Sequence, residues 1–175
     1  MFASIYLPNF YLQAAMRHQR ELCTKPVALI EEQDKKPVLI QLNEAAEKTG
    51  IRKGMTPSQA LARSLEVVIK ARARTQEKSI QQLLLHFAFI LSPFVEATAP
   101  GVCTIQFTDN RDLTAKLSHV IEQLAECKIT ARAGIASTPD ASVLAAHLAR
   151  PVLEINDAKE FLARLPIETL AMIGT

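Results

Sequence analysis

The sequence has no tryptophan, only five glycines, and three cysteines among its 175 residues. Cys23, Cys103 and Cys127 are odd in number and far apart, so a disulfide framework is not expected. No apolar run reaches the roughly 18 residues that a membrane span needs. The first residues lack the basic region of a signal peptide. These absences predict a packed protein of a reducing cytoplasm.

Neither sign of charge is in large excess. Twenty Lys and Arg stand against eighteen Asp and Glu, which leaves a formal net charge of +2. A dedicated polyanion binder is usually much more basic, so the composition alone does not indicate a nucleic-acid partner. The four histidines have no Cys or His at zinc-ligand spacing. We therefore expect neither a metal site nor another cofactor.

Nearly half of the residues, 49%, are hydrophobic, and they are arranged in short strands and amphipathic helices. Apolar runs predict strands at residues 2–7, 27–30, 38–41, 67–70, 95–99, 102–107 and 129–136. Periodicity and capping signals predict helices at residues 10–18, 43–49, 56–63, 75–91, 113–124, 138–149 and 157–165. Asn9 is expected to cap the first of these helices, Gly50 to end the second, and Thr56 and Gln59 to form a capping box at the third. The strands at residues 27–30 and 38–41 are expected to pair as a hairpin.

The order of these elements indicates the fold class. From residue 75 onward the chain reads helix, two strands, helix, strand, helix. A helix that crosses over between antiparallel or mixed strands predicts an α+β fold, with a mixed or antiparallel sheet and helices packed on one face. The stretch from about residue 12 to residue 74 interrupts this core, and we expect it to form a smaller inserted domain.

Six short segments stand in a fixed order along the chain. They are Ile5-Tyr6-Leu7-Pro8-Asn9, Lys25-Pro26-Val27-Ala28, residues 47–55, Leu91-Ser92-Pro93-Phe94-Val95-Glu96, residues 133–151 beginning Ala-Gly-Ile-Ala, and residues 165–174. In this order and at these spacings they resemble the Y-family (DinB- and UmuC-like) translesion DNA polymerases. Among these, they are most similar to the catalytically inactive ImuB-like proteins of bacterial mutagenesis cassettes.

The resemblance implies a domain organisation. Residues 1–11 and 75–165 would form the palm, and residues 12–74 the inserted fingers. Residues 166–175 would open the helix-hairpin-helix of a thumb that the chain does not complete. The chain is therefore expected to be the N-terminal part of a longer protein.

The resemblance also places the family's metal-binding carboxylates on this sequence. The first acidic position falls on Leu7, the second on Asn9, and the acidic pair on Gly101 and Val102. Nucleotidyl transfer uses two Mg²⁺ ions, and Mg²⁺ prefers carboxylate oxygen. None of the four side chains supplies one. The sequence therefore predicts an inactive nucleotidyltransferase that is not an enzyme and holds no metal.

The positions that contact the incoming nucleotide in the family are changed as well. Its sugar-gating aromatic falls on Leu12, its Tyr and Arg of the fingers on Glu44 and Glu47, and its Lys after the Gly-Ile-Ala segment on Pro139. A triphosphate is held by cations and hydroxyls, whereas two glutamates would repel it. No nucleotide binding is expected at these positions.

Two groups of charged residues remain. Lys70, Arg72 and Arg74 alternate along an extended stretch and are candidate DNA-backbone contacts, although a solvated face explains them as well. Asp109 and Asp112 lie near the acidic-pair position, but both precede a helix. We expect them to cap that helix rather than to replace the missing carboxylates.

The main functional hypothesis is a non-catalytic accessory or scaffold protein in error-prone translesion synthesis, as part of SOS-type DNA damage tolerance. By resemblance, its partners would be a sliding clamp, a RecA-like accessory protein and an error-prone C-family polymerase. DNA contact would be weak, and the location would be the bacterial cytoplasm near the nucleoid. Two alternatives stay open: a divergent but active Mg-dependent translesion polymerase, and a protein-interaction module that does not touch DNA.

Overall fold

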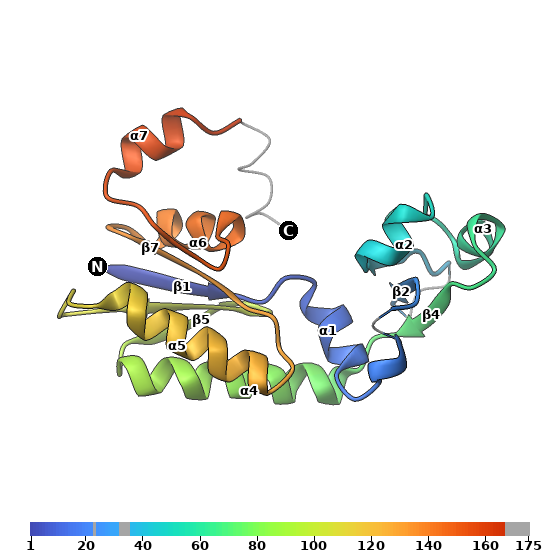
Figure 1. Cartoon of the computed structure of the whole chain (residues 1–175), viewed down its shortest axis with the longest axis horizontal. Helices are drawn as coiled ribbons and strands as arrows, with labels where there is room; N and C mark the ends of the chain where they lie inside the picture. Colours follow the sequence, from blue (N-terminus) through green and yellow to red (C-terminus); the bar gives the residue numbers. More distant parts are fainter. Residues whose placement is uncertain (23, 32–35, 167–175) are drawn as a thin grey trace. The chain divides into compact units, whose positions relative to one another are not determined.

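The structure is a computed structural model that describes residues 1–22, 24–31 and 36–166. The chain divides into two compact units, drawn in Figure 1. The first unit comprises residues 1–8 and the chain from residue 81 onward, and the second comprises residues 9–80. Within the described residues, no helix has the length and apolar character that crossing a membrane requires.

The first unit is built on a five-stranded sheet in the order β5-β6-β1-β7-β8. Its strands are β1 (Phe2–Tyr6), β5 (Val95–Ala99), β6 (Val102–Gln106), β7 (Arg132–Ala136) and β8 (Val152–Glu154). The central strand β1 is antiparallel to both β6 and β7, whereas β7 and β8 are parallel. The sheet is therefore mixed, as the sequence predicts.

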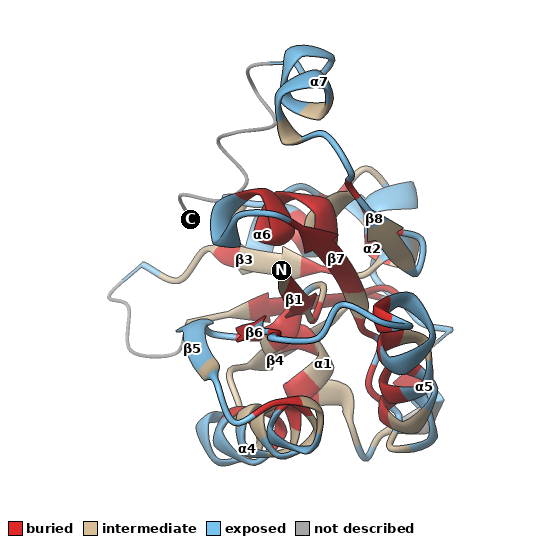
Figure 2. Cartoon of the chain, turned by 90° about the vertical axis from the view of Figure 1, so that its left-hand side faces the viewer, coloured by how far each residue is buried: buried red, intermediate tan, exposed pale blue. Residues whose placement is uncertain are grey.

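Three helices cover this sheet: α4 (Arg74–Leu91), α5 (Leu113–Glu126) and α6 (Pro139–Leu148). A short helix, α7 (Ala158–Ala163), follows β8 and has no buried residue. Figure 2 shows α4 and α5 below the sheet and α6 above it. The α+β class is confirmed, and α6 adds cover to part of the second face. The boundary between the two units, after residue 80, falls inside α4.

The close approach of α6 to the sheet depends on small residues. Gly134 in β7 has no side chain, and a Cβ there would lie 2.2 Å from the backbone nitrogen of Ala146 in α6. On the helix side, Ala141, Ala145 and Ala146 are buried. Because interiors are close-packed, this stretch of small residues sets how near the helix lies to the strand.

The second unit contains a three-stranded sheet in the order β3-β2-β4. Its elements are β2 (Val27–Ile30), β3 (Leu39–Leu42), β4 (Val68–Ala71), α1 (Phe10–Met16), α2 (Glu44–Lys48), α3 (Pro57–Arg63) and a 3-10 turn, η1 (Arg20–Leu22). The predicted hairpin is confirmed, since β2 and β3 pair antiparallel, and β4 pairs with β2 in parallel.

Two local predictions about helix ends are confirmed. Thr56 and Gln59 form a reciprocal capping box at the start of α3, with Gln59 N donating to Thr56 Oγ1 at 3.3 Å and Thr56 N donating to Gln59 Oε1 at 2.9 Å. Gly50 follows α2 with φ +84°, the left-handed conformation that favours glycine after a helix.

Two other capping predictions are wrong. Asn9 before α1 and Asp112 before α5 have φ values of 49° and 55°, and neither side chain accepts a hydrogen bond from its helix. A capping residue ordinarily has an extended backbone that turns its side chain toward the first amides, and the left-handed backbone here does not. Asp109 instead accepts from the backbone and side chain of Arg111.

The remaining predictions concern the cysteines, the start of the thumb and the domain boundaries. Cys103 and Cys127 are free thiols, and burial raises the pKa of Cys103 to about 12. Cys23 lies outside the described residues, as do residues 167–175, where the thumb was expected to begin. The expected domain boundaries at 11/12 and 74/75 stay a prediction beside the observed division after residues 8 and 80.

Candidate functional site

The carboxyl end of β1 meets the turn between β5 and β6. Leu7 N donates to the carbonyl oxygen of Gly101 at 2.8 Å, and Tyr6 pairs with Val102 across the strands. Three of the four predicted metal positions therefore come together. We call Leu7, Gly101 and Val102 the β1 corner. Asn9, the fourth position, belongs to the second unit, where its Nδ2 donates to Leu42 O at 3.4 Å.

The β1 corner does not fit a pair of Mg²⁺ ions. Leu7 is fully buried and Val102 is 6% exposed, and their side chains are hydrocarbon. The Gly101 carbonyl is already engaged by Leu7 N. Among the described residues there is no group of three or more His, Cys, Asp or Glu that could hold a metal. Since Mg²⁺ requires oxygen ligands, no catalytic step is assigned to an ion at this corner.

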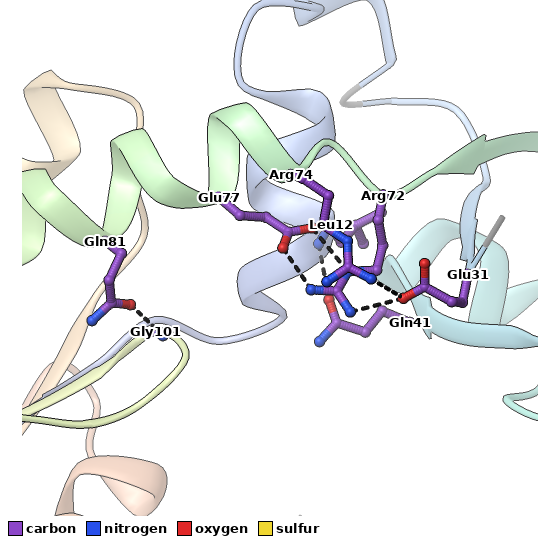
Figure 3. A network of polar contacts seen from close by, with 8 residues as sticks. All are labelled: Leu12, Glu31, Gln41, Arg72, Arg74, Glu77, Gln81 and Gly101. Carbon is purple, nitrogen blue, oxygen red and sulfur yellow. Dashed lines mark hydrogen bonds and ion pairs between the residues drawn. The ribbon is translucent and has the colours of Figure 1, made fainter. Parts of the chain in front are cut away.

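Gln81 is a site residue that the sequence analysis missed. Its Oε1 accepts a hydrogen bond from Gly101 N at 2.8 Å, as Figure 3 shows. Both backbone polar groups of Gly101 are thus engaged, one by Gln81 and the other by Leu7. Gln81 is one of several polar residues on α4, and no local pattern in the sequence distinguishes it from the others.

An aromatic pair lies beside the β1 corner. The rings of Tyr6 and His147 stack with centroids 3.9 Å apart and 19° between their planes. Arg132, the β7 partner of Tyr6, donates from Nη1 to the carbonyl oxygen of His147 at 3.2 Å. Burial raises the pKa of the Tyr6 phenol, against the opposing charge of Arg132. Burial and the same cation both lower the pKa of His147.

The two glutamates predicted to repel a nucleotide lie in one groove of the second unit. Glu44 and Glu47 line a space of about 400 Å³ together with Lys48 and Arg52. Lys48 Nζ contacts Glu44 Oε1 at 2.7 Å, and this hydrogen bond lowers the pKa of Glu44. Arg52 Nη1 donates to the carbonyl oxygens of Glu47 and Ile51, each at 2.8 Å. The groove therefore carries both signs of charge.

The other predicted nucleotide positions are not part of this groove. Leu12 in α1 is 4% exposed, and its backbone N donates to Gln41 Oε1 at 2.9 Å. Pro139 is the first residue of α6 in the first unit, where it lines a separate hollow with Phe2 and Phe94. The roles proposed for these positions stay predictions.

The three candidate DNA contacts differ in how firmly their side chains are paired with other residues of the second unit. Arg72 lies at the centre of an internal cluster in the second unit: its guanidinium contacts Glu31 at 2.9 Å and Glu77 at 2.5 Å, and lies 3.7 Å from the Tyr11 ring centroid. The hydrogen bonds to Glu77 raise the pKa of Arg72 above its usual value. The charge of Arg72 is therefore neutralised within the unit, as Figure 3 shows.

Lys70 and Arg74 are held more loosely. Lys70 Nζ donates to Gln19 Oε1 at 2.5 Å, and Arg74, whose side chain is 55% exposed, contacts Glu31 at 2.9 Å. Contact of these two residues with a DNA backbone stays a prediction.

The small net charge of the chain conceals an uneven distribution. Residues 9–80 contain 13 Lys and Arg and 8 Asp and Glu, a formal charge of +5. The remaining residues contain 7 and 10, a formal charge of −3. A basic inserted unit is the part that an anionic ligand would approach, which the whole-chain value of +2 did not reveal.

Comparisons with known proteins give the family. Residues 5–147 match the impB/mucB/samB family. A protein named DNA polymerase IV from Ralstonia nicotianae is 24% identical over 94% of this chain and 49% of its own length. The protein of the same name from Protochlamydia amoebophila is 26% identical over 97% of the chain and 51% of its own length. The chain thus spans about half the length of the curated relatives it matches.

Solved structures show the same fold. A binary complex of Dbh DNA polymerase superposes on 99% of this chain with a TM-score of 0.85 and 17% identity, and covers 54% of its own chain. DinB from Sulfolobus solfataricus superposes on 96% with a TM-score of 0.81 and 15% identity, over 52% of its own chain. At such identities the similarity establishes architecture alone.

The prediction that the chain is not an enzyme is wrong. Curated relatives that match 94% of it or more are named DNA polymerase IV, the name of an enzyme. The carboxylates missing at Leu7, Gly101 and Val102 limit what the β1 corner can bind, but they do not define the activity of a whole protein. The chain belongs to the impB/mucB/samB family and has the palm and fingers fold of Y-family DNA polymerases.

Proposed function

We propose that this chain supplies the palm and fingers of a divergent translesion DNA polymerase, which extends a primer on a template in DNA damage tolerance. One observation carries the proposal: a single family match runs through both units, and the curated relatives with this span are named DNA polymerase IV. Because the chain spans about half of those relatives, the activity is proposed for a protein of their length.

The groove of the second unit is the proposed contact for the incoming nucleotide. Lys48 and Arg52 supply its positive charge. Two carbonyl oxygens hold one nitrogen of Arg52, so the rest of the guanidinium is oriented before a phosphate arrives. The pair Lys48–Glu44 is largely exposed, and such pairs are weakly held. A triphosphate can therefore replace Glu44 as the partner of Lys48, whereas the negative charge of Glu47 would repel the triphosphate.

A primer-extension assay on the full-length protein tests the proposal. A primed template with the four deoxynucleotides and Mg²⁺ or Mn²⁺ should give template-directed addition. Lys48→Ala and Arg52→Ala should each raise the KM for the nucleotide about tenfold with a smaller change in kcat, because they remove ground-state binding. Lys53→Ala, an exposed neighbour outside the groove, is the matched control and should change neither.

Absence of any extension by the full-length protein with either ion would overturn the proposal. Binding of the primed template without extension would leave a DNA-contacting role, and absence of DNA binding would favour the protein-interaction module. The ImuB-like subgroup, the SOS context, the location in the cytoplasm near the nucleoid, and the three expected partners stay predictions. Those partners are the sliding clamp, the RecA-like protein and the C-family polymerase.

A further inference from the structure

We propose that the free edge of strand β5 docks an extended segment of a partner protein that carries an apolar side chain and, two positions further along, a Lys or Arg. We call Phe94, Val95, Glu96 and the hollow beside them the β5 edge site. All of it belongs to the first unit, and the inference does not rest on the proposed function.

The outer side of β5 has no neighbouring strand among the described residues. It ends the strand order of its sheet, with β6 on its inner side, and four of its five residues are exposed, as Figure 2 shows. Phe94 O accepts from Gln106 N at 2.9 Å. Because backbone groups alternate in direction along an antiparallel strand, those of Val95 point to the free edge. Such an edge is a template on which another strand can pair.

The start of β5 is held in place without a partner. Ser92 is buried, and its Oγ donates to Gln106 O at 2.7 Å and accepts from Phe94 N at 3.2 Å. The register with β6 shifts after Glu96, and such irregularities disfavour further pairing at an edge. The site is therefore limited to the segment from Phe94 to Glu96, which is already extended and costs a partner little to order.

A hollow of about 250 Å³ adjoins this segment. Phe2, Phe94 and Pro139 give it apolar walls, and the Phe94 side chain is 55% exposed. Alternate side chains of an added strand point to the same face. One apolar side chain of that strand can therefore enter the hollow while the side chain two positions away reaches Glu96.

Charge selects the kind of partner. Among the described residues that line the hollow, Glu96 alone is charged, and it is exposed. Asp140, also exposed, directly follows Pro139 at the wall of the hollow, and the unit as a whole has a formal charge of −3. A Lys or Arg matches this surface. A second copy paired through β5 would instead bring another Glu96 close to the first, and like charges across a strand pair are unfavourable.

A fluorescently labelled peptide added to the full-length protein tests the inference. The probe is a capped peptide of the order Thr-Val-Thr-Lys-Thr-Val-Thr-Lys-Thr, in which valine and lysine share one face. Fluorescence anisotropy measures its affinity, and hydrogen exchange followed by mass spectrometry locates it. Binding should slow exchange in the fragment that contains residues 94–99, because paired amides exchange more slowly than open ones.

Two changes to the peptide separate charge from backbone pairing. Glutamate in place of both lysines should weaken binding about tenfold or more. N-methylation of the alternate amides that face β5 should abolish binding, whereas N-methylation of the other alternate set should leave it, because only one set donates to the strand.

A variant of the protein tests the role of Glu96. Glu96→Lys should reverse the preference, so that the glutamate peptide binds about tenfold more tightly than the lysine peptide. Glu122→Lys is the matched control. It makes the same change of charge at an exposed position on α5, away from the hollow, and should keep the preference for the lysine peptide.

Several results would overturn the inference. They are no binding of the lysine peptide, protection of a different segment, equal affinity for the lysine and glutamate peptides, or equal effects of the two N-methylated peptides. Dimers of the protein that the lysine peptide dissociates would show that a second copy occupies the edge instead. None of these measurements uses primer extension, so failure of the proposed function would leave them unaffected.

Discussion

Ser4 Oγ on the central strand β1 lies 2.7 Å from Ser142 Oγ on helix α6, so one hydroxyl pair joins the sheet to the helix. Ser142 donates its proton to Pro139 O at 2.7 Å, so Ser4 must donate to Ser142. Thr104 then donates to Ser4 at 3.1 Å, and Thr98 to Thr104 at 2.7 Å. Because each hydroxyl has one proton, the hydrogen bonds that join these four hydroxyls all run in one direction, from Thr98 at the edge of the sheet to Ser142 in α6.

Ser142→Ala should destabilise the protein by about 1–3 kcal/mol, because it leaves the buried Ser4 hydroxyl without its acceptor. Thr98→Ala should lower the free energy of unfolding by less, since Thr98 is exposed and its removal only deprives Thr104 Oγ1 of one hydrogen bond that it accepts. Urea unfolding measures both. Ser137→Ala, an exposed serine just before α6, is the control and should be nearly neutral.

A double variant refines the same prediction. Ser4→Ala combined with Ser142→Ala should cost less than the sum of the two single changes, because neither hydroxyl is then left unpaired. Strict additivity would show that the two hydroxyls are not coupled.

Gly134→Ala should destabilise the protein severely, by about 3 kcal/mol or more, since overpacking against an unyielding neighbour exceeds the usual cost. The new Cβ would lie 2.2 Å from Ala146 N and 2.3 Å from Ser142 O, and backbone atoms cannot rotate aside. Gly54→Ala is the comparison: nothing lies within 4 Å of its Cβ, and only its φ of +84° is unfavourable, a cost of about 1 kcal/mol. Equal melting temperatures for the two variants would contradict the packing described for α6.

Stability below neutral pH should depend on His147. Its pKa in the folded protein is lowered from 6.5 by burial and by Arg132, so the unfolded chain binds a proton that the folded protein resists. The free energy of unfolding should therefore fall as the pH drops below about 6.5 toward the lowered pKa. His147→Phe keeps a ring against Tyr6 and should reduce this fall between pH 7.5 and 5.5.

The exposed His119 supplies the control for that measurement. His119→Gln should leave the pH dependence of unfolding as it is in the wild type. The His147 interpretation would be wrong if His147→Phe and the wild type lost the same stability over this pH range.

What the sequence could predict was set by the range of each interaction. The capping box of Thr56 and Gln59 involves residues only three positions apart, and so the local sequence predicts it correctly. Asn9 and Asp112 have capping chemistry, but their backbones are left-handed, and residue identity alone does not reveal that. Strand β8, three residues long, offers too little periodicity to recognise.

The site shows the same limit. The resemblance gave the register that brings Leu7 beside Gly101, because family spacing encodes tertiary neighbours. Gln81 was missed because its contact with Gly101 spans 20 positions and leaves no local pattern. Lys48 and Arg52 were not predicted, because both follow Glu47 and neither stands at a nucleotide position that the resemblance marks.

Arg72→Met should destabilise the second unit by about 3–5 kcal/mol, the usual cost of removing one partner from a buried ion pair. The side chains of Arg72 and Glu77 are only 15% and 8% exposed, so Glu77 would be left as a buried charge without its cation. Arg74→Met is the control, because Arg74 is 55% exposed and an exposed pair contributes at most about 1 kcal/mol.

A further variant separates charge from packing at this cluster. Arg72→Met combined with Glu77→Gln removes both charges and should recover part of the stability lost in Arg72→Met alone. Urea unfolding followed by circular dichroism measures all four proteins. If the double variant were less stable than Arg72→Met, the stacking of the guanidinium on Tyr11 and its second contact to Glu31, rather than the pairing with Glu77, would be the dominant contribution of Arg72.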